Sequence, residues 1–251
     1  MFKFQSLNKL VLAPIFVVAL TFSLPLNAGV LGHWAADGWS LLDAEDSVGN
    51  GGYVGPGWGG QSFDAEYLFY KQEGNLLSIG VQSGFDLVAG EQVYGDREYF
   101  SGDLALAFNG GAYDHAVDFG WETKDYDGDY VTAAADAAGL YSVTSWNNDI
   151  YFTVSSPFAM ESGSFLSGIS TTSGSAALAD GVSFYRTATI DLASLGFDVN
   201  SFSAHWTMSC GNDMVEGSAD VTTSVPEPGA LLLMAGGLLG LFGGRRLRRH
   251  A

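Results

Sequence analysis

The sequence predicts an all-β protein with a single antiparallel β-sandwich or jelly-roll domain, flanked by an apolar segment at each end. Three observations support this prediction. Short apolar segments rich in β-branched and aromatic residues recur along the chain, turn-forming residues separate them, and one ten-residue stretch alternates apolar and polar side chains almost perfectly. We expect the domain at residues 29–216 and a linker at residues 217–224.

Several short segments are good strand candidates because they are apolar, rich in β-branched or aromatic residues, and bounded by Gly, Asn, Asp and Ser. In chain order they are residues 76–81, 104–108, 113–119, 140–146, 150–155 and 184–190. Residues 130–139 and 192–196 could instead hold short helices. No convincing internal repeat is present.

The clearest strand is Ser201–Cys210, because its apolar and polar residues fall on opposite faces. Trp206 and Cys210 belong to the apolar face, which should point inward, and His205 belongs to the polar face, which should be solvated. Cys210 is the only cysteine in the chain, so no internal disulfide can form. Burial in apolar surroundings would raise the pKa of its thiol and suppress a nucleophilic role.

Residues 1–28 have the order of a secretory signal peptide. Lys3 and Lys9 precede an apolar stretch from Leu10 to Leu24, and Ala28 supplies a small residue at the expected cleavage point. The alternative is a permanent membrane anchor, but the apolar stretch is short for a bilayer span of ~20 residues. We therefore expect export through the Sec translocon and cleavage by signal peptidase.

The C-terminal end has three parts in a fixed order. Val225, Pro226, Glu227 and Pro228 come first, and each proline disfavours helix at the residue before it. An apolar run at residues 229–244 follows and is marginal as a membrane helix. The basic tail, residues 245–251, should stay in the cytoplasm and contains Arg245, Arg246, Arg248 and Arg249.

This layout resembles a PEP-CTERM protein-sorting signal over residues 225–251. The resemblance implies recognition by exosortase, an integral-membrane cysteine enzyme of Gram-negative bacteria that make exopolysaccharide. It also implies a transient inner-membrane intermediate, followed by delivery to the cell surface or extracellular matrix. A simple tail anchor is the alternative.

The stretches FDAEYLFY, LLSIGVQSGF, GDLALAF and HWTMSCGND, which lie between Phe63 and Asp213, resemble a group of exosortase-dependent surface proteins with one β-rich domain. The resemblance gives no catalytic residues.

The segment between the two ends is strongly acidic. It holds four basic and 27 acidic residues between Gly29 and Val225, a net charge of −23. Such a surface repels nucleic acid and anionic lipid head groups, and it attracts divalent cations or basic partners.

The best ligand-like stretch is the alternating triplet Asp125, Asp127 and Asp129, because calcium loops place oxygen ligands at every second residue. The positions of Gly128 and Asp136 do not fit an EF-hand, so a simpler Ca²⁺ loop and an acidic hairpin turn both remain open. The stretch from Cys210 to Asp213 is a second candidate, with a tight turn as the favoured interpretation.

No zinc, nucleophile-elbow or convincing nucleotide motif is visible. Aromatic side chains that could stack on sugars are Trp34, Trp39, Trp58, Tyr94, Trp121 and Trp146. The expected function is therefore a non-enzymatic structural or binding role, with exopolysaccharide as a candidate partner. A secreted carbohydrate-active hydrolase is the alternative, because a retaining glycosidase needs only two carboxylates about 5 Å apart.

Overall fold

The computed structural model describes residues 29–35, 38–44, 59–132, 137–179 and 181–221. The predicted signal peptide and the whole predicted sorting segment lie outside these ranges. No helix within these ranges is long and apolar enough to cross a membrane.

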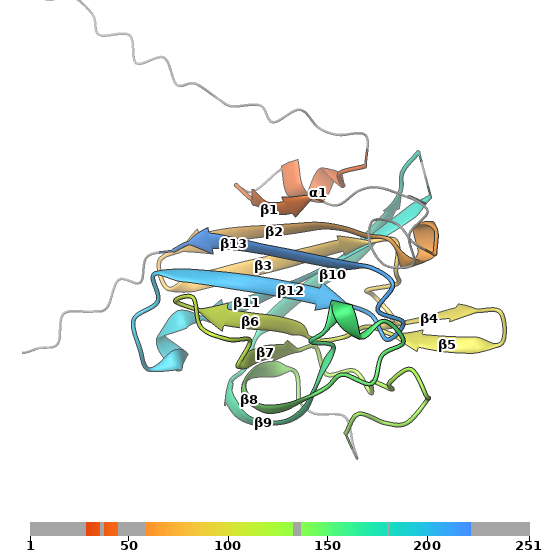
Figure 1. Ribbon diagram of the computed structural model, residues 1–251. Coiled ribbons are helices and arrows are strands. Elements are labelled where there is room, and N and C mark those ends of the chain that lie inside the picture. The colour runs from red at the N-terminus through yellow and green to blue at the C-terminus, as the bar shows by residue number, and fades with distance from the viewer. Residues whose placement is uncertain (1–28, 36–37, 45–58, 133–136, 180, 222–251) are drawn as a thin grey trace, which may run out of the picture.

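The chain forms two antiparallel sheets and a separate hairpin (Figure 1). The first sheet has the order β1 (Ser40–Ala44), β2 (Ala65–Glu73), β3 (Leu76–Ser83), β11 (Val182–Asp191) and β10 (Ser170–Ala177). The second has the order β13 (Met214–Asp220), β12 (Ser201–Thr207), β6 (Leu104–Phe108), β7 (His115–Asp118), β8 (Gly139–Asn147) and β9 (Ala159–Ser167). Strands β4 (Glu91–Tyr94) and β5 (Arg97–Phe100) form the hairpin.

Four short helical turns complete the described fold. They are α1 (Gly32–Ala35), η1 (Gln61–Phe63), η2 (Thr153–Ser155) and η3 (Leu192–Leu195). The predicted short helix at residues 192–196 is confirmed: the Asp191 side chain accepts a hydrogen bond from Ala193 N, and Gly196 ends the turn at φ 76°. The predicted helical stretch 130–139 lies partly outside the described residues.

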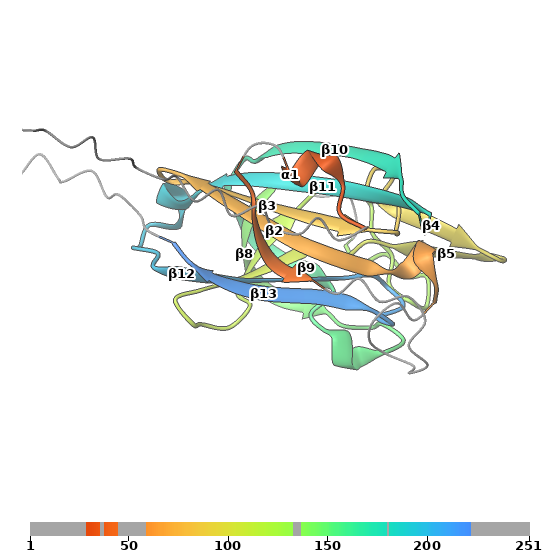
Figure 2. The same ribbon diagram turned by 90° about the horizontal axis from the view of Figure 1, so that it is seen from above.

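The two sheets lie face to face, with their inward side chains in one core (Figure 2). Alternate residues Leu77, Ile79 and Val81 of β3 belong to the same buried cluster as Phe202 and Trp206 of β12. Trp206 is fully buried, and its Nε1 donates a hydrogen bond to Ser101 Oγ at 3.0 Å. The prediction of an all-β protein with antiparallel sheets is therefore confirmed.

Most of the predicted strands are present in the structure, and the prediction of one strand is wrong. Strands β3, β6, β8 and β11 cover the predicted segments 76–81, 104–108, 140–146 and 184–190, and β7 lies within the predicted segment 113–119. The segment 150–155 forms no strand and contains η2 instead. Tyr151 and Val154 are 60% and 70% exposed, so the apolar pattern of this segment does not reflect burial.

The predicted boundary at residue 216 is also wrong. Strand β13 continues to Asp220, and residues 217–220 pair in register with Ala204, Ser203, Phe202 and Ser201 of β12. The stretch contains Gly217, Ser218 and Asp220, which favour turns and loops in the sequence. Pairing with a buried central strand overrides that local preference.

The N-terminal segment covers the outer face of the first sheet. The Trp34 ring stacks on Phe69 with centroids 4.5 Å apart and lies against Gly80, where an added Cβ would come 2.4 Å from the ring. The fully buried Gln82 holds this segment in place, because its Oε1 accepts from Leu31 N at 3.0 Å and from Trp34 Nε1 at 2.7 Å. Its Nε2 donates to the carbonyl of Gly29.

Candidate functional site

An open groove of about 370 Å³ lies beside the β4–β5 hairpin. This volume is within the range of small-molecule sites. Three parts of the chain build it: the turn that enters β4, the strand β5, and the loop that follows β7. The lining residues are Ala89, Gly90, Glu91, Glu98, Phe100, Trp121, Glu122, Lys124 and Tyr130.

Three aromatic side chains supply the apolar surface of the groove. Phe100 is buried, Trp121 is half-buried, and the ring of Tyr130 is 54% exposed. Gly90 packs directly against Trp121 at φ +81°, and a Cβ at this position would come 2.4 Å from the indole ring. Only glycine fits both the backbone conformation and this close contact.

A cation supports Trp121 from within the protein. The Arg186 guanidinium carbon lies 4.4 Å from the Trp121 ring centroid and 5.0 Å from that of Phe119. Burial lowers the pKa of Arg186. Its Nε is buried and has no hydrogen-bond partner among the described residues, and its Nη2 donates a long hydrogen bond to the Phe119 carbonyl at 3.5 Å. The cation–π contacts add to this bond in holding the guanidinium against the rings.

A lysine ammonium lies within the groove. Lys124 Nζ lies 3.5 Å from Glu98 Oε2, 5.0 Å from the Tyr130 ring centroid and 5.4 Å from that of Phe100. An isolated β-bridge pairs Lys124 with Tyr130 and fixes the two side chains near each other. Glu91 and Glu122 are exposed and complete the polar lining. The groove therefore combines the exposed Tyr130 ring, three glutamate carboxylates and the ammonium group of Lys124, which is paired with one of them.

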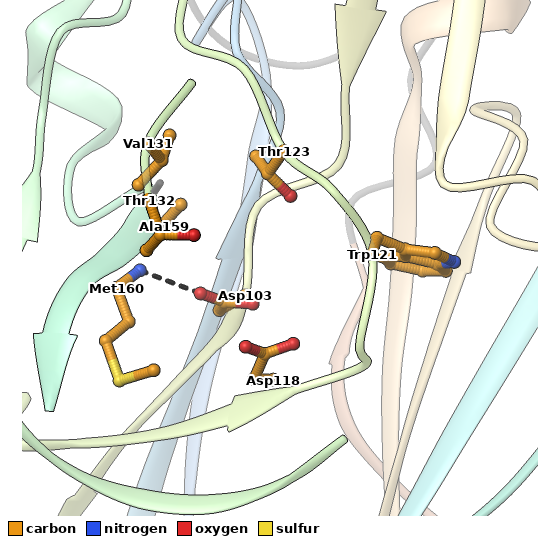
Figure 3. Close-up of a pocket in the computed structure, with 8 residues that line it drawn as sticks. All are labelled: Asp103, Asp118, Trp121, Thr123, Val131, Thr132, Ala159 and Met160. Atoms are coloured by element: carbon orange, nitrogen blue, oxygen red, sulfur yellow. Dashed lines mark hydrogen bonds between the residues drawn. The ribbon is translucent and has the colours of Figure 1, made fainter. Parts of the chain in front are cut away.

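A second, smaller pocket has Trp121 and Thr123 among its lining residues (Figure 3). Its volume is about 10 Å³, the space of about one water molecule. Asp103 and Asp118 point into it, and both are less than one-tenth exposed. Asp103 Oδ2 accepts from Met160 N at 2.7 Å, and Asp118 Oδ1 accepts from Gly120 N at 2.5 Å. The first hydrogen bond ties the residue before β6 to the start of β9, and the second holds the turn just after β7. The pocket is too small for a ligand, and its carboxylates hold the backbone.

The predicted calcium loop is an acidic turn. Asp125 N donates to Asp129 O at 2.9 Å, and Asp125 Oδ1 accepts from Asp129 N at 3.0 Å. Asp125 is buried, whereas Asp127 and Asp129 are exposed. Within the part of the chain that the structure describes, no three His, Cys, Asp or Glu side chains are placed to hold a metal ion. The geometry thus matches the hairpin-turn alternative and gives the Ca²⁺ prediction no support.

Asp149 adds a fourth negative charge to this turn. Desolvation, followed by the charges of Asp127, Asp125 and Asp129, raises the pKa of Asp149. The backbone of Asp149 reaches the same turn, because Tyr126 N donates to its carbonyl at 3.0 Å. Four carboxylates with the same charge therefore lie near one another at this turn. Among the described residues they are not arranged as the ligands of a bound cation would be.

The stretch from Cys210 to Asp213 is a tight structural turn, as favoured from the sequence. Gly211 has φ +62°, and Asp213 Oδ2 accepts from Ala65 N at 2.9 Å, which ties the turn to the start of β2. Cys210 is buried as predicted, and burial raises the pKa of its thiol to about 12. The thiol donates to Asn212 Oδ1 at 2.7 Å, so it is an inert core group.

His205 is buried, and its predicted solvated position is wrong. The alternation of β12 does place it on the face opposite Trp206, but the segment that contains η2 covers that face. His205 is 0% exposed, and its Nε2 lies 2.9 Å from the carbonyl oxygen of Ser155. Sequence periodicity predicts the face of a side chain, but it carries no information about a loop that covers this face from 50 residues away.

Only part of the groove was predicted from the sequence. Trp121 is among the aromatic residues proposed for sugar stacking, and it lines the groove. Trp34 belongs to the N-terminal segment and is buried against the first sheet, and Trp58 lies outside the described residues. No sequence pattern pointed to Phe100, Tyr130 or the three glutamates, because they come from separate strands and loops.

The fold and the groove define an all-β protein with antiparallel sheets and a ligand-sized surface depression. Comparison with protein-family models adds one match: residues 224–249 fit the PEP-CTERM protein-sorting motif. The chain therefore carries a PEP-CTERM sorting signal, which includes the Pro226-Glu227-Pro228 element and the four arginines of the basic tail. This signal marks a protein exported by exosortase processing, with a membrane-associated intermediate before it reaches the surface. Neither the curated proteins nor the solved structures provide a match.

Proposed function

We propose that this protein is a non-enzymatic, glycan-binding component of the cell surface or extracellular matrix of a Gram-negative bacterium. The two stacked sheets act as a β-sandwich scaffold that presents the groove. Sec-dependent export and signal-peptidase cleavage at the N-terminus precede exosortase processing at the C-terminus. Exopolysaccharide is the natural candidate ligand, because sorting delivers the domain to the compartment where polysaccharide accumulates.

The observation that supports glycan binding is the combination of aromatic and carboxylate side chains in one open groove. The exposed ring of Tyr130 offers a flat apolar surface on which the C–H face of a pyranose can stack. Glu91 and Glu122 offer acceptors for sugar hydroxyl groups at the rim. A sugar needs both kinds of contact, since it has an apolar face and a polar edge.

A glycan array probed with the full chain, purified in mild detergent, tests the proposal. We expect binding to a limited set of oligosaccharides, lost on the substitution Tyr130→Ala and kept on Tyr151→Ala. Tyr151 is a matched control, because its ring is 60% exposed and does not line the groove. Absence of binding to every glycan, with a folded protein, would refute the proposed function.

A carbohydrate-active hydrolase remains the second candidate, because three glutamates line an aromatic groove. Glu91, Glu98 and Glu122 are all exposed, however, whereas a general acid needs a carboxyl group held in apolar surroundings. Glu98 is also paired with Lys124. An assay for new reducing ends, run on every oligosaccharide that binds, separates the two functions. Product formation that is lost in Glu122→Gln would establish the hydrolase.

A further inference from the structure

We propose that the groove recognises ammonium-bearing amino sugars, as in a glycan with free 2-amino groups. This inference rests on the proposed glycan-binding function and names the class of sugar. It follows from the charges of the groove and from the position of Lys124.

The Lys124 ammonium shows what kind of group this groove holds. It lies between the rings of Tyr130 and Phe100, at 5.0 Å and 5.4 Å from their centroids, and it contacts Glu98 at 3.5 Å. Aromatic faces attract ammonium groups through their quadrupole, and carboxylates attract them through charge. The contacts of Lys124 thus show that the aromatic rings and carboxylates of the groove can bind an ammonium group.

Two further carboxylates are available for a ligand. Glu91 and Glu122 line the groove and are exposed, and among the described residues neither takes part in an ion pair. With Glu98 and Lys124 included, the groove carries three negative charges and one positive charge. The segment around it has a net charge of −23. Long-range and local fields therefore both favour a cationic ligand over an acidic glycan.

The aromatic surface favours an amino sugar over a basic peptide. The exposed Tyr130 ring and the edge of the groove at Trp121 form an apolar surface beside the carboxylates. A pyranose ring with an ammonium substituent can stack on such a surface while its charge meets Glu91 or Glu122. A lysine side chain offers the same ammonium on a flexible stem, which loses more rotational freedom on binding.

Isothermal titration of the full chain in mild detergent compares four soluble probes. They are a glucosamine hexamer, the fully N-acetylated hexamer, a glucose hexamer with the same β-1,4 linkage, and hexalysine. We expect the glucosamine hexamer to bind at least about tenfold more tightly than the other three. Its affinity should fall as salt is raised, since the contacts at the rim are exposed to screening.

The double substitution Glu91→Gln and Glu122→Gln should reduce this preference to about twofold or less, because it keeps shape and removes charge. Glu161→Gln on the exposed part of β9 is the control and should leave the preference unchanged. Urea unfolding of each variant verifies that the fold is retained.

The outcomes separate this inference from the proposed function. Equal binding of the N-acetylated or glucose hexamer overturns the amino-sugar assignment but leaves glycan binding intact. Equal binding of hexalysine also overturns it, since the groove would then recognise a bare ammonium. Failure of all three oligosaccharides overturns the inference, and the glycan array then decides separately whether the proposed function also fails.

Discussion

The buried imidazole of His205 places its Nδ1 3.3 Å from Oε2 of Glu216, a side chain that is 51% exposed. The other ring nitrogen, Nε2, lies 2.9 Å from the carbonyl oxygen of Ser155. Because a carbonyl oxygen only accepts, the proton belongs on Nε2 in the neutral ring. The lone pair of Nδ1 then faces the carboxylate, so the pair is favourable only when the ring is protonated.

Burial decides the protonation of this pair and predicts a pH dependence of stability. Desolvation lowers the pKa of His205 below its usual 6.5, although Ser155 and Glu216 partly oppose the shift. The unfolded chain therefore binds a proton more readily than the folded one in the range just below pH 6.5. The stabilisation by neutral His205 is complete above pH 6.5 and is lost as the pH falls toward the folded pKa.

Urea unfolding from pH 8 to pH 5 measures this effect in the wild type and in His205→Gln. We expect the free energy of unfolding of the wild type to fall more steeply below pH 6.5 than that of the variant, since glutamine does not titrate. Carboxylates remote from this ring, unlike Glu216, contribute equally to both proteins and cancel in the comparison. Parallel curves would show that His205 keeps its ordinary pKa in the fold.

A second prediction concerns the core side of the same strand. Trp206 is 0% exposed and packs against Phe85, so Trp206→Ala should cost ~3–5 kcal/mol in the free energy of unfolding. Val154→Ala is the control, since Val154 is 70% exposed and its loss should change stability by less than ~0.5 kcal/mol. Urea melts at fixed pH compare the two. A loss below ~1 kcal/mol for Trp206→Ala would mean that the two sheets do not enclose this side chain.

Two neighbouring residues show what sequence patterns predict and what they miss. The alternation in β12 correctly predicts that Trp206 and Cys210 face the core, because a strand fixes side-chain direction with period two. It fails for His205, because burial on the outer face depends on the distant segment around Ser155. Strand β10 was missed for a related reason. Its residues are mostly exposed on both faces, so it carries no apolar alternation.

The groove was predicted even less well than the strands. Gly90, Phe100 and Tyr130 belong to the entry of β4, to β5 and to a later loop, and only the tertiary fold brings them together. The Asp125–Asp129 stretch shows the opposite case, in which a sequence pattern fits two structures. Its spacing fits a cation loop, but the backbone hydrogen bonds of the turn use Asp125 and leave Asp127 and Asp129 pointing to solvent.

A third prediction uses two glycines of the groove region. Gly90→Ala should distort Trp121, because the added Cβ would lie 2.4 Å from the indole ring, and it should weaken glycan binding at least about tenfold. Gly95→Ala is a matched control. Gly95 also has a positive φ, but no atom lies within 4 Å of its added Cβ. It should therefore cost only the ~1–2 kcal/mol of a left-handed alanine and keep full binding. Equal loss of binding in both variants would argue against a role for Trp121.

A fourth prediction concerns divalent cations. Because Asp127 and Asp129 point to solvent and Asp125 holds the turn, Ca²⁺ and Mg²⁺ should raise the thermal midpoint equally, by screening alone. Asp125→Ala should cost about 1 kcal/mol, since it removes the acceptor of the part-buried Asp129 N–H, whereas Asp127→Asn should be neutral or slightly stabilising because it removes one of several like charges. Thermal melts of the three proteins in chelator, Ca²⁺ and Mg²⁺ measure both effects. A shift specific to Ca²⁺ that disappears in Asp127→Asn would restore the calcium loop.

The last prediction concerns sorting. The family match covers residues 224–249 and so includes both the proline-bracketed glutamate and the arginines. Replacing Pro226, Glu227 and Pro228 by alanine should leave an uncleaved precursor in the inner membrane, because it removes the proline–glutamate–proline element of the matched sorting motif. Cell fractionation and a blot against the β domain detect this precursor by its larger size. Replacing Thr222 and Thr223 by alanine, just before the matched segment, is the control and should leave processing intact. Normal release of a shortened product from the triple variant would show that this element is not what exosortase recognises.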